Sequence, residues 1–127
     1  MEYGIKKQIS LSYNEAIEKV KAELSKEGFG VLTEIDVKTT LKKKIDVDFD
    51  KYIILGACNP NFAYEALQNE QDIGLLLPCN IIIYEKESIT YVSAIDPTIA
   101  MNFVENEKLR CITKEVREKL LNVIHNL

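Results

Sequence analysis

Residues 52–60, Tyr-Ile-Ile-Leu-Gly-Ala-Cys-Asn-Pro, join a strand that is apolar on both faces to the start of a helix. A strand without polar alternation is typical of the centre of a sheet, where both of its faces are covered. Asn59 is a preferred helix-capping residue, and Pro60 suits the first turn of a helix. We therefore expect a central strand over residues 52–58, followed by a helix whose inward side chains are Phe62, Ala63, Ala66 and Leu67.

A strand and a helix are expected before this centre, and a second strand leads into it. Apolar residues occupy every second position from Tyr3 to Leu11, with Lys7 as the exception, which is the alternation of a half-buried strand. Ser12 and Glu15 have the spacing of a capping box at a helix start. The expected elements are a strand over residues 3–11, a helix over 13–27 that ends at Gly28, a strand over 29–37 and a short, lysine-faced helical turn over 39–44.

After the central strand and its helix, the sequence predicts a hairpin and two more helices. Residues 80–85 and 89–95 are apolar segments around the polar Glu-Lys-Glu-Ser at 85–88, which favours two strands joined by a tight turn. Asp96-Pro97 repeats the cap-and-proline signal and predicts a short helix that runs to about residue 104. The last helix is expected from residue 113 to the end, with one apolar stripe formed by Val116, Leu120, Val123, Ile124 and Leu127.

This order of elements predicts a single α+β domain over residues 1–127. A chain of 127 residues has the length of one domain. Two amphipathic helices with one apolar stripe each can cover one face of a sheet, and the half-polar first strand together with the hairpin favours antiparallel pairing. We expect a two-layer sandwich in which a mostly antiparallel sheet of about five strands carries its helices on one face. The other face then needs cover, for which we expect a homodimer.

Composition argues against several classes of function. The 20 acidic residues outnumber the 16 basic residues and give a net charge of −4, unlike a general nucleic-acid binder. The longest apolar stretches, residues 52–58 and 73–79, are far shorter than the roughly 20 residues that cross a bilayer. The start of the chain has no signal-peptide features, and the three cysteines have no CxxC spacing. We expect a cytoplasmic protein with free thiols that binds neither nucleic acid nor membrane.

Four segments carry a family resemblance: Gly-Phe-Gly-Val-Leu-Thr-Glu-Ile-Asp-Val at 28–37 with Thr-Leu-Lys-Lys-Lys at 40–44, Ile-Leu-Gly-Ala-Cys-Asn-Pro at 54–60, Gly-Leu-Leu-Leu-Pro-Cys-Asn at 74–80, and Ser-Ala-Ile-Asp-Pro at 93–97. Over nearly the whole chain, the sequence resembles the domain-of-unknown-function family 302. The resemblance implies a TATA-binding-protein-like fold, in which a strand, a helix, four strands and a helix follow one another, and it implies a dimer. It implies no catalytic residue, because the activity of the family is not established. Asp46 departs from the family pattern, which has glycine in that turn.

Two Cys-Asn pairs mark the candidate site. Cys58 ends the central strand directly before a helix N-terminus, where backbone amides and the helix dipole favour a thiolate or a bound anion. Cys79 stands just before the next strand, between Pro78 and Asn80. Antiparallel pairing of the two strands, which the resembled fold implies, brings both pairs to one end of the sheet, whereas a parallel crossover separates them. The candidate ligand-binding residues are Cys58, Asn59, Pro60, Cys79, Asn80 and Lys42, the last because a lysine run can neutralise a phosphate or carboxylate.

Each of these residues also has a purely structural interpretation. Free cysteines often pack as small hydrophobic side chains, Asn59 can cap its helix, Asn80 can bond local backbone, and the lysines at 42–44 can simply be solvated. No aromatic residues interleave with that run, so it does not favour single-stranded nucleic acid. Cys111, in the polar stretch before the last helix, has no functional setting. Two thiolates without a nearby histidine leave a tetrahedral zinc site two ligands short unless a dimer partner supplies them, so we expect no metal and no cofactor.

Three functions remain open on these observations. The first is the binding of a small anionic or polar ligand at a pocket lined by the Cys-Asn pairs. The second is a thiol-dependent enzyme or redox protein that uses Cys58 with Cys79. The third is a structural or partner-binding dimer in which the cysteines only pack. A solvent-open pocket at the cysteines favours the first, an exposed thiol within disulfide reach of the other favours the second, and two dry, buried thiols favour the third.

Overall fold

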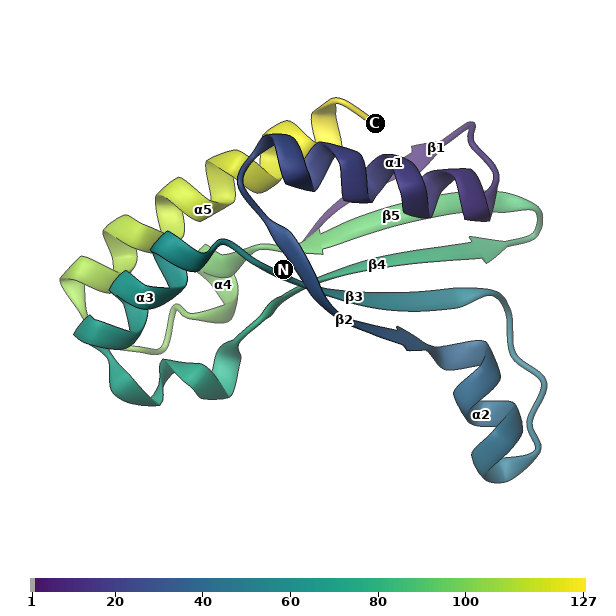
Figure 1. Ribbon diagram of the computed structural model, residues 1–127, viewed down its shortest axis with the longest axis horizontal. Coiled ribbons are helices and arrows are strands. Elements are labelled where there is room, and N and C mark those ends of the chain that lie inside the picture. Colours follow the sequence, from purple (N-terminus) through teal and green to yellow (C-terminus); the bar gives the residue numbers. More distant parts are fainter. Residues whose placement is uncertain (1) are drawn as a thin grey trace.

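Five antiparallel strands form one sheet, in the order β1-β5-β4-β3-β2, in the computed structural model, which describes residues 2–127. The strands are β1 (Gly4–Ile9), β2 (Gly30–Asp36), β3 (Tyr52–Cys58), β4 (Cys79–Lys86) and β5 (Ile89–Ile95). The long helices α1 (Tyr13–Lys26) and α5 (Glu107–His125) run side by side over the sheet (Figure 1). The predicted two-layer α+β fold with an antiparallel sheet is confirmed.

The shorter helices gather at the two ends of the sheet. Helix α3 (Pro60–Asn69), the 3-10 helix η1 (Gln71–Leu76) and the single-turn helix α4 (Pro97–Ala100) lie at one end, next to the first half of α5 (Figure 1). Helix α2 (Val37–Ile45) projects from the opposite end, between β2 and β3, and none of its residues is buried. One end of the molecule therefore carries the three short helices α3, η1 and α4, and the other end carries an arm formed by α2.

The core lies between the sheet and the two long helices. Strand residues alternate in burial, so that Leu55, Ile81, Ile83 and Val92 face the helices and are fully buried. Lys7, which interrupts the apolar alternation of β1, lies on the same face, where its Nζ donates to the carbonyl oxygens of Leu127 at 2.9 Å and His125 at 3.2 Å. A lysine at this position supplies positive charge and donors to the C-terminal end of α5, where unpaired carbonyls concentrate negative partial charge.

Local helix signals are confirmed in most places, but the start of α5, the end of α4 and one side chain of α3 differ from the prediction. The capping box of Ser12 and Glu15 is present at α1. Helix α5 begins at Glu107 rather than at residue 113, because Asn106 caps it by accepting a hydrogen bond from the Leu109 amide. Cys111 is therefore an exposed residue within α5, not part of a loop before it. Helix α4 ends at Ala100, four residues short of the predicted end, and Leu67 on α3 is 41% exposed instead of facing inward.

The lysine-bearing segment is longer than predicted and has an unusual end. It forms a helix over Val37–Ile45, capped by the Asp36 carboxylate, which accepts from the Thr39 amide, and β2 consequently stops at Asp36. Asp46 follows with a φ of 55°, in the left-handed region that glycine adopts most easily. The position at which the sequence departs from the family pattern is thus a helix-terminating residue whose backbone still has the conformation typical of glycine.

Candidate functional site

The pairing of β3 with β4 brings the two Cys-Asn motifs together. Ala57 of β3 lies directly opposite Cys79 of β4, so Cys58, the next residue of β3, lies at the same end of the sheet. The two strands are antiparallel neighbours, which excludes the parallel crossover that would have separated the thiols. The predicted juxtaposition of Cys58 and Cys79 is confirmed.

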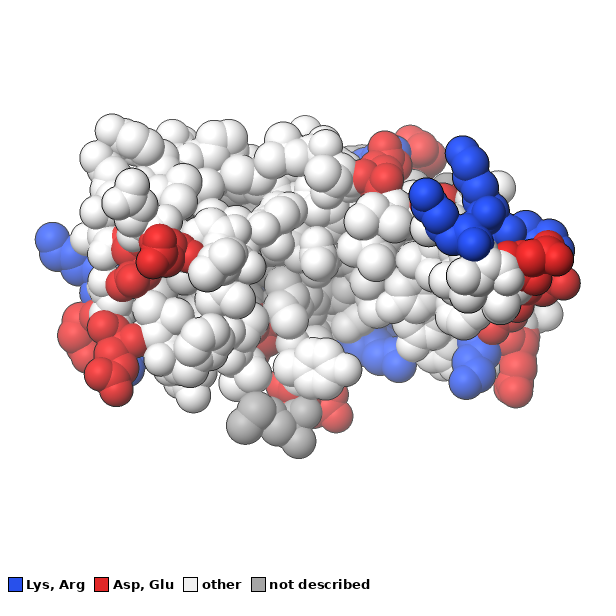
Figure 2. Space-filling view, turned by 90° about the horizontal axis from the view of Figure 1, so that it is seen from below, with Lys and Arg blue, Asp and Glu red and all other residues white. Residues whose placement is uncertain are grey.

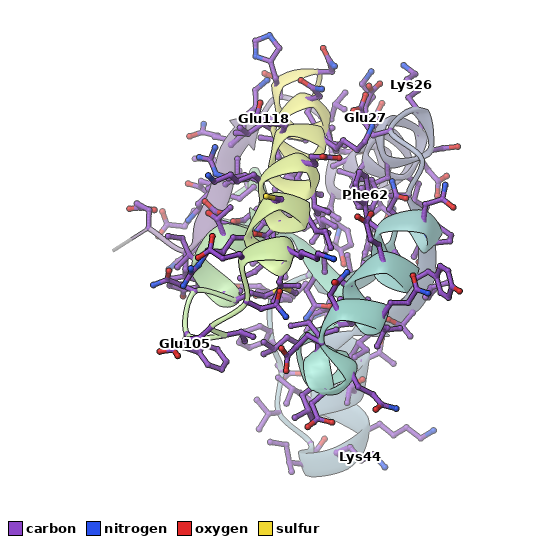
Figure 3. The ribbon with its side chains drawn as sticks, turned by 90° about the vertical axis from the view of Figure 1, so that its left-hand side faces the viewer. Lys26, Glu27, Lys44, Phe62, Glu105 and Glu118 are labelled. Carbon is purple, nitrogen blue, oxygen red and sulfur yellow. The ribbon has the colours of Figure 1, made fainter. Side chains whose placement is uncertain are left out.

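A small cavity of about 40 Å³ lies at this end of the sheet, between the strand ends and the helices α3, α4 and α5. Both cysteines line it, together with side chains from each of the three helices. Phe62 projects between α3 and α5 (Figure 3), and Met101 closes the cavity beside α4. Its lining includes Cys58, Cys79, Phe62, Ala63, Ala66 and Met101.

The surface of the cavity is formed by carbon and sulfur, without a contribution from nitrogen or oxygen. Cys79 is only 9% exposed. Burial, and secondarily the neighbouring Cys58, raise the pKa of the Cys79 thiol to about 11, so it is protonated at neutral pH. Cys58 is half-buried and is the thiol nearer to solvent. No disulfide joins the three cysteines of the described chain.

The asparagines and Pro60 surround this cavity without lining it. The Asn59 side chain makes no cap hydrogen bond to α3; its Nδ2 instead donates to the Glu27 carbonyl oxygen at 3.3 Å. The helix-cap interpretation of that side chain is therefore wrong, because Asn59 ties the start of α3 to the end of α1. Asn80 is exposed on β4 opposite Gly56, and Pro60 is exposed in the first turn of α3.

Lys42 lies far from the cysteines, on the arm formed by α2. Its ammonium group pairs with the carboxylates of Asp46 at 3.0 Å and Asp48 at 3.2 Å, so its charge is already matched within the arm. Figure 2 shows Lys and acidic side chains gathered at the end of the molecule formed by α2, with few charged side chains in the middle of this side. The structure thus separates Lys42 from the other five candidate residues.

An ion pair holds the wall of the cavity that α4 and α5 provide. Arg117 Nε on α5 donates to Asp96 Oδ2 at 2.9 Å, and the Thr98 hydroxyl and amide donate to Oδ1 of the same carboxylate. Burial opposes ionisation of Asp96, but the hydrogen bonds from Thr98 and Arg117 outweigh it and lower the pKa of the carboxyl group below its ordinary value. Because Asp96 immediately precedes Pro97 and the single turn of α4, this pair positions Pro97 and Met101 at the cavity.

A family model described as "Domain of unknown function DUF302" matches residues 5–127. The chain belongs to the DUF302 family. The match covers nearly the whole chain and confirms the resemblance seen in the Cys-Asn segments. A crystal structure titled as an uncharacterized conserved DUF302 protein from Bacillus stearothermophilus is 28% identical, covers 98% of each chain and superimposes with a TM-score of 0.92. The comparison with curated proteins gives no match.

The described part of this DUF302 chain has neither a group of side chains suited to a metal ion nor a helix suited to cross a membrane. Across residues 2–127, no three His, Cys, Asp or Glu side chains are grouped so that they could hold a metal ion. Within the same residues, no helix combines the length and apolarity needed to cross a membrane. The sulfur-bearing residues that line the cavity are Cys58, Cys79 and Met101.

Sequence reasoning missed a second feature of the DUF302 chain, a row of stacked tyrosines on the sheet face opposite the helices. Tyr52, Tyr84 and Tyr91 are register partners on β3, β4 and β5, with ring centroids 5.4 and 5.2 Å apart. Lys6 of β1 continues the row, with Nζ 5.0 Å from the centroid of Tyr91. These residues are dispersed in the sequence, so only the strand order 1-5-4-3 places them side by side.

Proposed function

We propose that this protein is a small ligand-binding domain whose site is the cavity lined by Cys58 and Cys79. The observation that carries the proposal is a cavity formed only by carbon and sulfur atoms at the point where two strand ends meet three helices. Apolar cavities with a few converging functional groups are the usual places for small ligands. The converging groups here are the two thiols, one buried and one half-buried.

The chemistry of the cavity favours a soft or apolar ligand over an anion. An anion needs donors or positive charge, and neither asparagine nor Lys42 reaches the cavity. A protein interior without polar partners penalises a buried charge strongly. The binding function predicted from the sequence is therefore retained, with the ligand class changed from anionic or polar to small and soft or apolar.

The thiol-dependent enzyme receives less support from the same geometry. A thiolate is the reactive form of cysteine, and the pKa of Cys79 near 11 keeps that thiol protonated at neutral pH. In the β3–β4 register, Ala57 rather than Cys58 faces Cys79. A role for the cysteines in packing alone explains the burial of Cys79 but leaves the half-buried Cys58 without a function.

Native mass spectrometry of the protein purified under non-denaturing conditions tests this proposal. We expect a retained mass that is released on denaturation. In Ala63→Leu, whose larger side chain fills the cavity, that mass should be lost, whereas Ala22→Leu on the exposed side of α1 should keep it. A wild-type chain with no retained mass, or equal retention in both variants, would contradict ligand binding in this cavity.

We also propose that two copies of the chain associate through the sheet face opposite the helices. No second layer covers that face (Figure 1), and exposed apolar side chains adjoin it on β2, α2 and the loop that follows, namely Ile35, Ile45, Val47 and Phe49. Contiguous apolar surface of this kind marks an association site. The protein is also proposed to work in the reducing cytoplasm, because its three cysteines are free and free thiols are typical of a reducing compartment.

Sedimentation velocity at micromolar concentration tests the association. We expect a dimer for the wild-type chain and a monomer for Ile35→Glu. The control Leu75→Glu introduces the same charge at a more exposed position on η1 and should remain dimeric. A monomeric wild-type chain would contradict the proposed dimer.

A further inference from the structure

Resting on the proposed function, we propose that the ligand is a short-chain carboxylate whose hydrocarbon tail fills the cavity and whose carboxylate lies outside it, in an adjoining cleft next to Lys114. The cleft has a volume of about 140 Å³ and lies between α4, with the residues that follow it, and the first half of α5. Four of its lining residues are polar, namely Thr98, Asn102, Arg110 and Lys114. An apolar cavity beside a polar cleft fits a ligand with one apolar end and one polar end.

The cavity and the cleft share a wall. Met101, Leu109 and Thr113 line both spaces, and all three residues are buried. Leu109 and Thr113 lie one turn apart on α5, whereas Met101 ends α4. A methionine side chain is unbranched and has three rotatable bonds, so it is the part of this wall that can move aside for a ligand while both helices stay in place. The tail and the head of the ligand then lie on the two sides of Met101.

The polar groups of the cleft favour a head with a single negative charge. Arg110 already pairs with Glu107 at 2.6 Å, and both threonine hydroxyl groups donate to protein oxygen atoms. Lys114 and Asn102 are exposed and offer an ammonium group and an amide group as donors. A carboxylate can accept from both and matches the charge of one lysine. Because the carboxylate stays in the cleft, no charge enters the cavity of carbon and sulfur atoms.

The volume of the cavity sets the length of the tail. The space is left on the side of α3 by Ala63 and Ala66, whose side chains end at Cβ. One water-sized group needs about 10 to 15 Å³ of cavity, so a cavity of 40 Å³ holds about three methylene or methyl groups. With the carboxyl carbon and the carbons that pass Met101, the chain that fits best has about five or six carbons. Each methylene that leaves water for the cavity should tighten binding about fourfold.

Chemical-shift titration with straight-chain carboxylates from acetate to octanoate tests the proposal. We expect the affinity of the wild-type chain to rise about fourfold with each added methylene and to stop rising at about pentanoate or hexanoate, when the cavity is full. Ala63→Leu, which fills the cavity, should remove this dependence on chain length. Lys114→Gln should weaken the binding of hexanoate about two- to fivefold and leave that of hexan-1-ol unchanged. The control Lys108→Gln removes the same charge from α5 outside the cleft and should change neither.

The proposal is overturned if no carboxylate binds, if affinity does not depend on chain length, if Lys114→Gln weakens hexanoate and hexan-1-ol equally, or if Lys108→Gln has the same effect as Lys114→Gln. Where Ala63→Leu is unfolded by far-UV circular dichroism, nuclear Overhauser effects from the terminal methyl group of hexanoate bound to the wild-type chain decide instead. Contacts with Phe62 and Met101 support the site, and contacts only with residues outside the cavity overturn it. A mass retained in native mass spectrometry without any binding of these carboxylates would overturn the carboxylate assignment and leave the ligand-binding function standing.

Discussion

Ala57 and Cys79 face each other across the β3–β4 pair, one residue before Cys58 on the one strand and one residue after Pro78 on the other. This register is what turns two Cys-Asn motifs that are separated by 21 positions in the sequence into neighbours at one end of a sheet. It also directs Cys79 to the helix-covered side, with Ile81 and Ile83, where the alternation of β4 buries every second residue. The cavity exists because α3, α4 and α5 close over this strand end.

Thiol reactivity should follow burial. We expect a neutral alkylating reagent at pH 7.5 to modify Cys111 first and Cys58 more slowly, while Cys79 stays unmodified until the protein is denatured. Cys79 is both inaccessible and protonated, because its pKa is raised to about 11. Peptide mass mapping after timed quenching gives the three rates separately. Modification of Cys79 at the rate of Cys111 in the folded protein would contradict the burial described above.

Gly56 should tolerate no side chain. A methyl group at this position would collide with the Thr33 hydroxyl and approach Pro78 Cγ to 2.8 Å, because the neighbouring side chains of β2 and of the segment before β4 lie over it. We expect Gly56→Ala to lower the free energy of unfolding by about 1 to 3 kcal/mol, the usual cost of overpacking. The matched control is Gly74→Ala, where a methyl group meets open space. Urea denaturation should show a much smaller change for the control.

Arg117 should contribute far more to stability than Arg110, although both form ion pairs on α5. Arg117 bonds to the buried carboxylate of Asp96, whereas Arg110 pairs with exposed Glu107 at 2.6 Å. We expect Arg117→Met to cost about 1.5 to 3 kcal/mol of unfolding free energy, as for hydrogen bonds to charged groups. Arg110→Met should cost about 0 to 1 kcal/mol. Equal losses in urea denaturation would contradict the role assigned to the Asp96–Arg117 pair.

The same pair predicts an acid-dependent loss of stability. The pKa of Asp96 is lower in the folded protein than its ordinary value of 3.8, so the unfolded chain takes up a proton first as the pH falls. The stabilisation is therefore complete above pH 3.8 and is lost as the pH falls through the folded-state value. We expect the difference in unfolding free energy between wild type and Asp96→Asn to shrink on acidification from pH 6. A difference that stays constant down to pH 2 would contradict the pKa shift.

Tyr84 should be the most important member of the tyrosine row, because it stacks on Tyr52 on one side and on Tyr91 on the other. Aromatic pairs contribute about 0.5 to 1.5 kcal/mol each beyond the area that they bury. We expect Tyr84→Ala to lower the free energy of unfolding by about 2 to 4 kcal/mol, measured by thermal and urea denaturation. Tyr64→Ala on the exposed side of α3, where the ring is 66% exposed, should change it little. A similar loss in both variants would show that the stack does not stabilise the sheet.

Several elements were determined by local chemistry and could be predicted from the sequence. The capping box of Ser12 and Glu15, the alternation of β1 and the proline at the start of α3 act within one or two turns or strand residues, and all three are present. The start of α5 was missed because its cap, Asn106, precedes a polar helical turn in which only Leu109 and Ile112 face inward. Charge and turn residues in such a segment do not distinguish a loop from an exposed helix.

The composition of the site was decided only by the tertiary structure. The residues alone left the pairing of the two cysteines open, and the resembled fold predicted it through antiparallel strands. Met101 and Phe62 are ordinary apolar residues until α3, α4 and α5 meet over the strand ends. The same folding carries Lys42 to the opposite end and turns the Asn59 side chain toward Glu27. Local signals act over a few residues through backbone hydrogen bonds and periodicity, whereas a cavity is formed by side chains from distant segments, and its chemistry depends on strand order, register and helix packing.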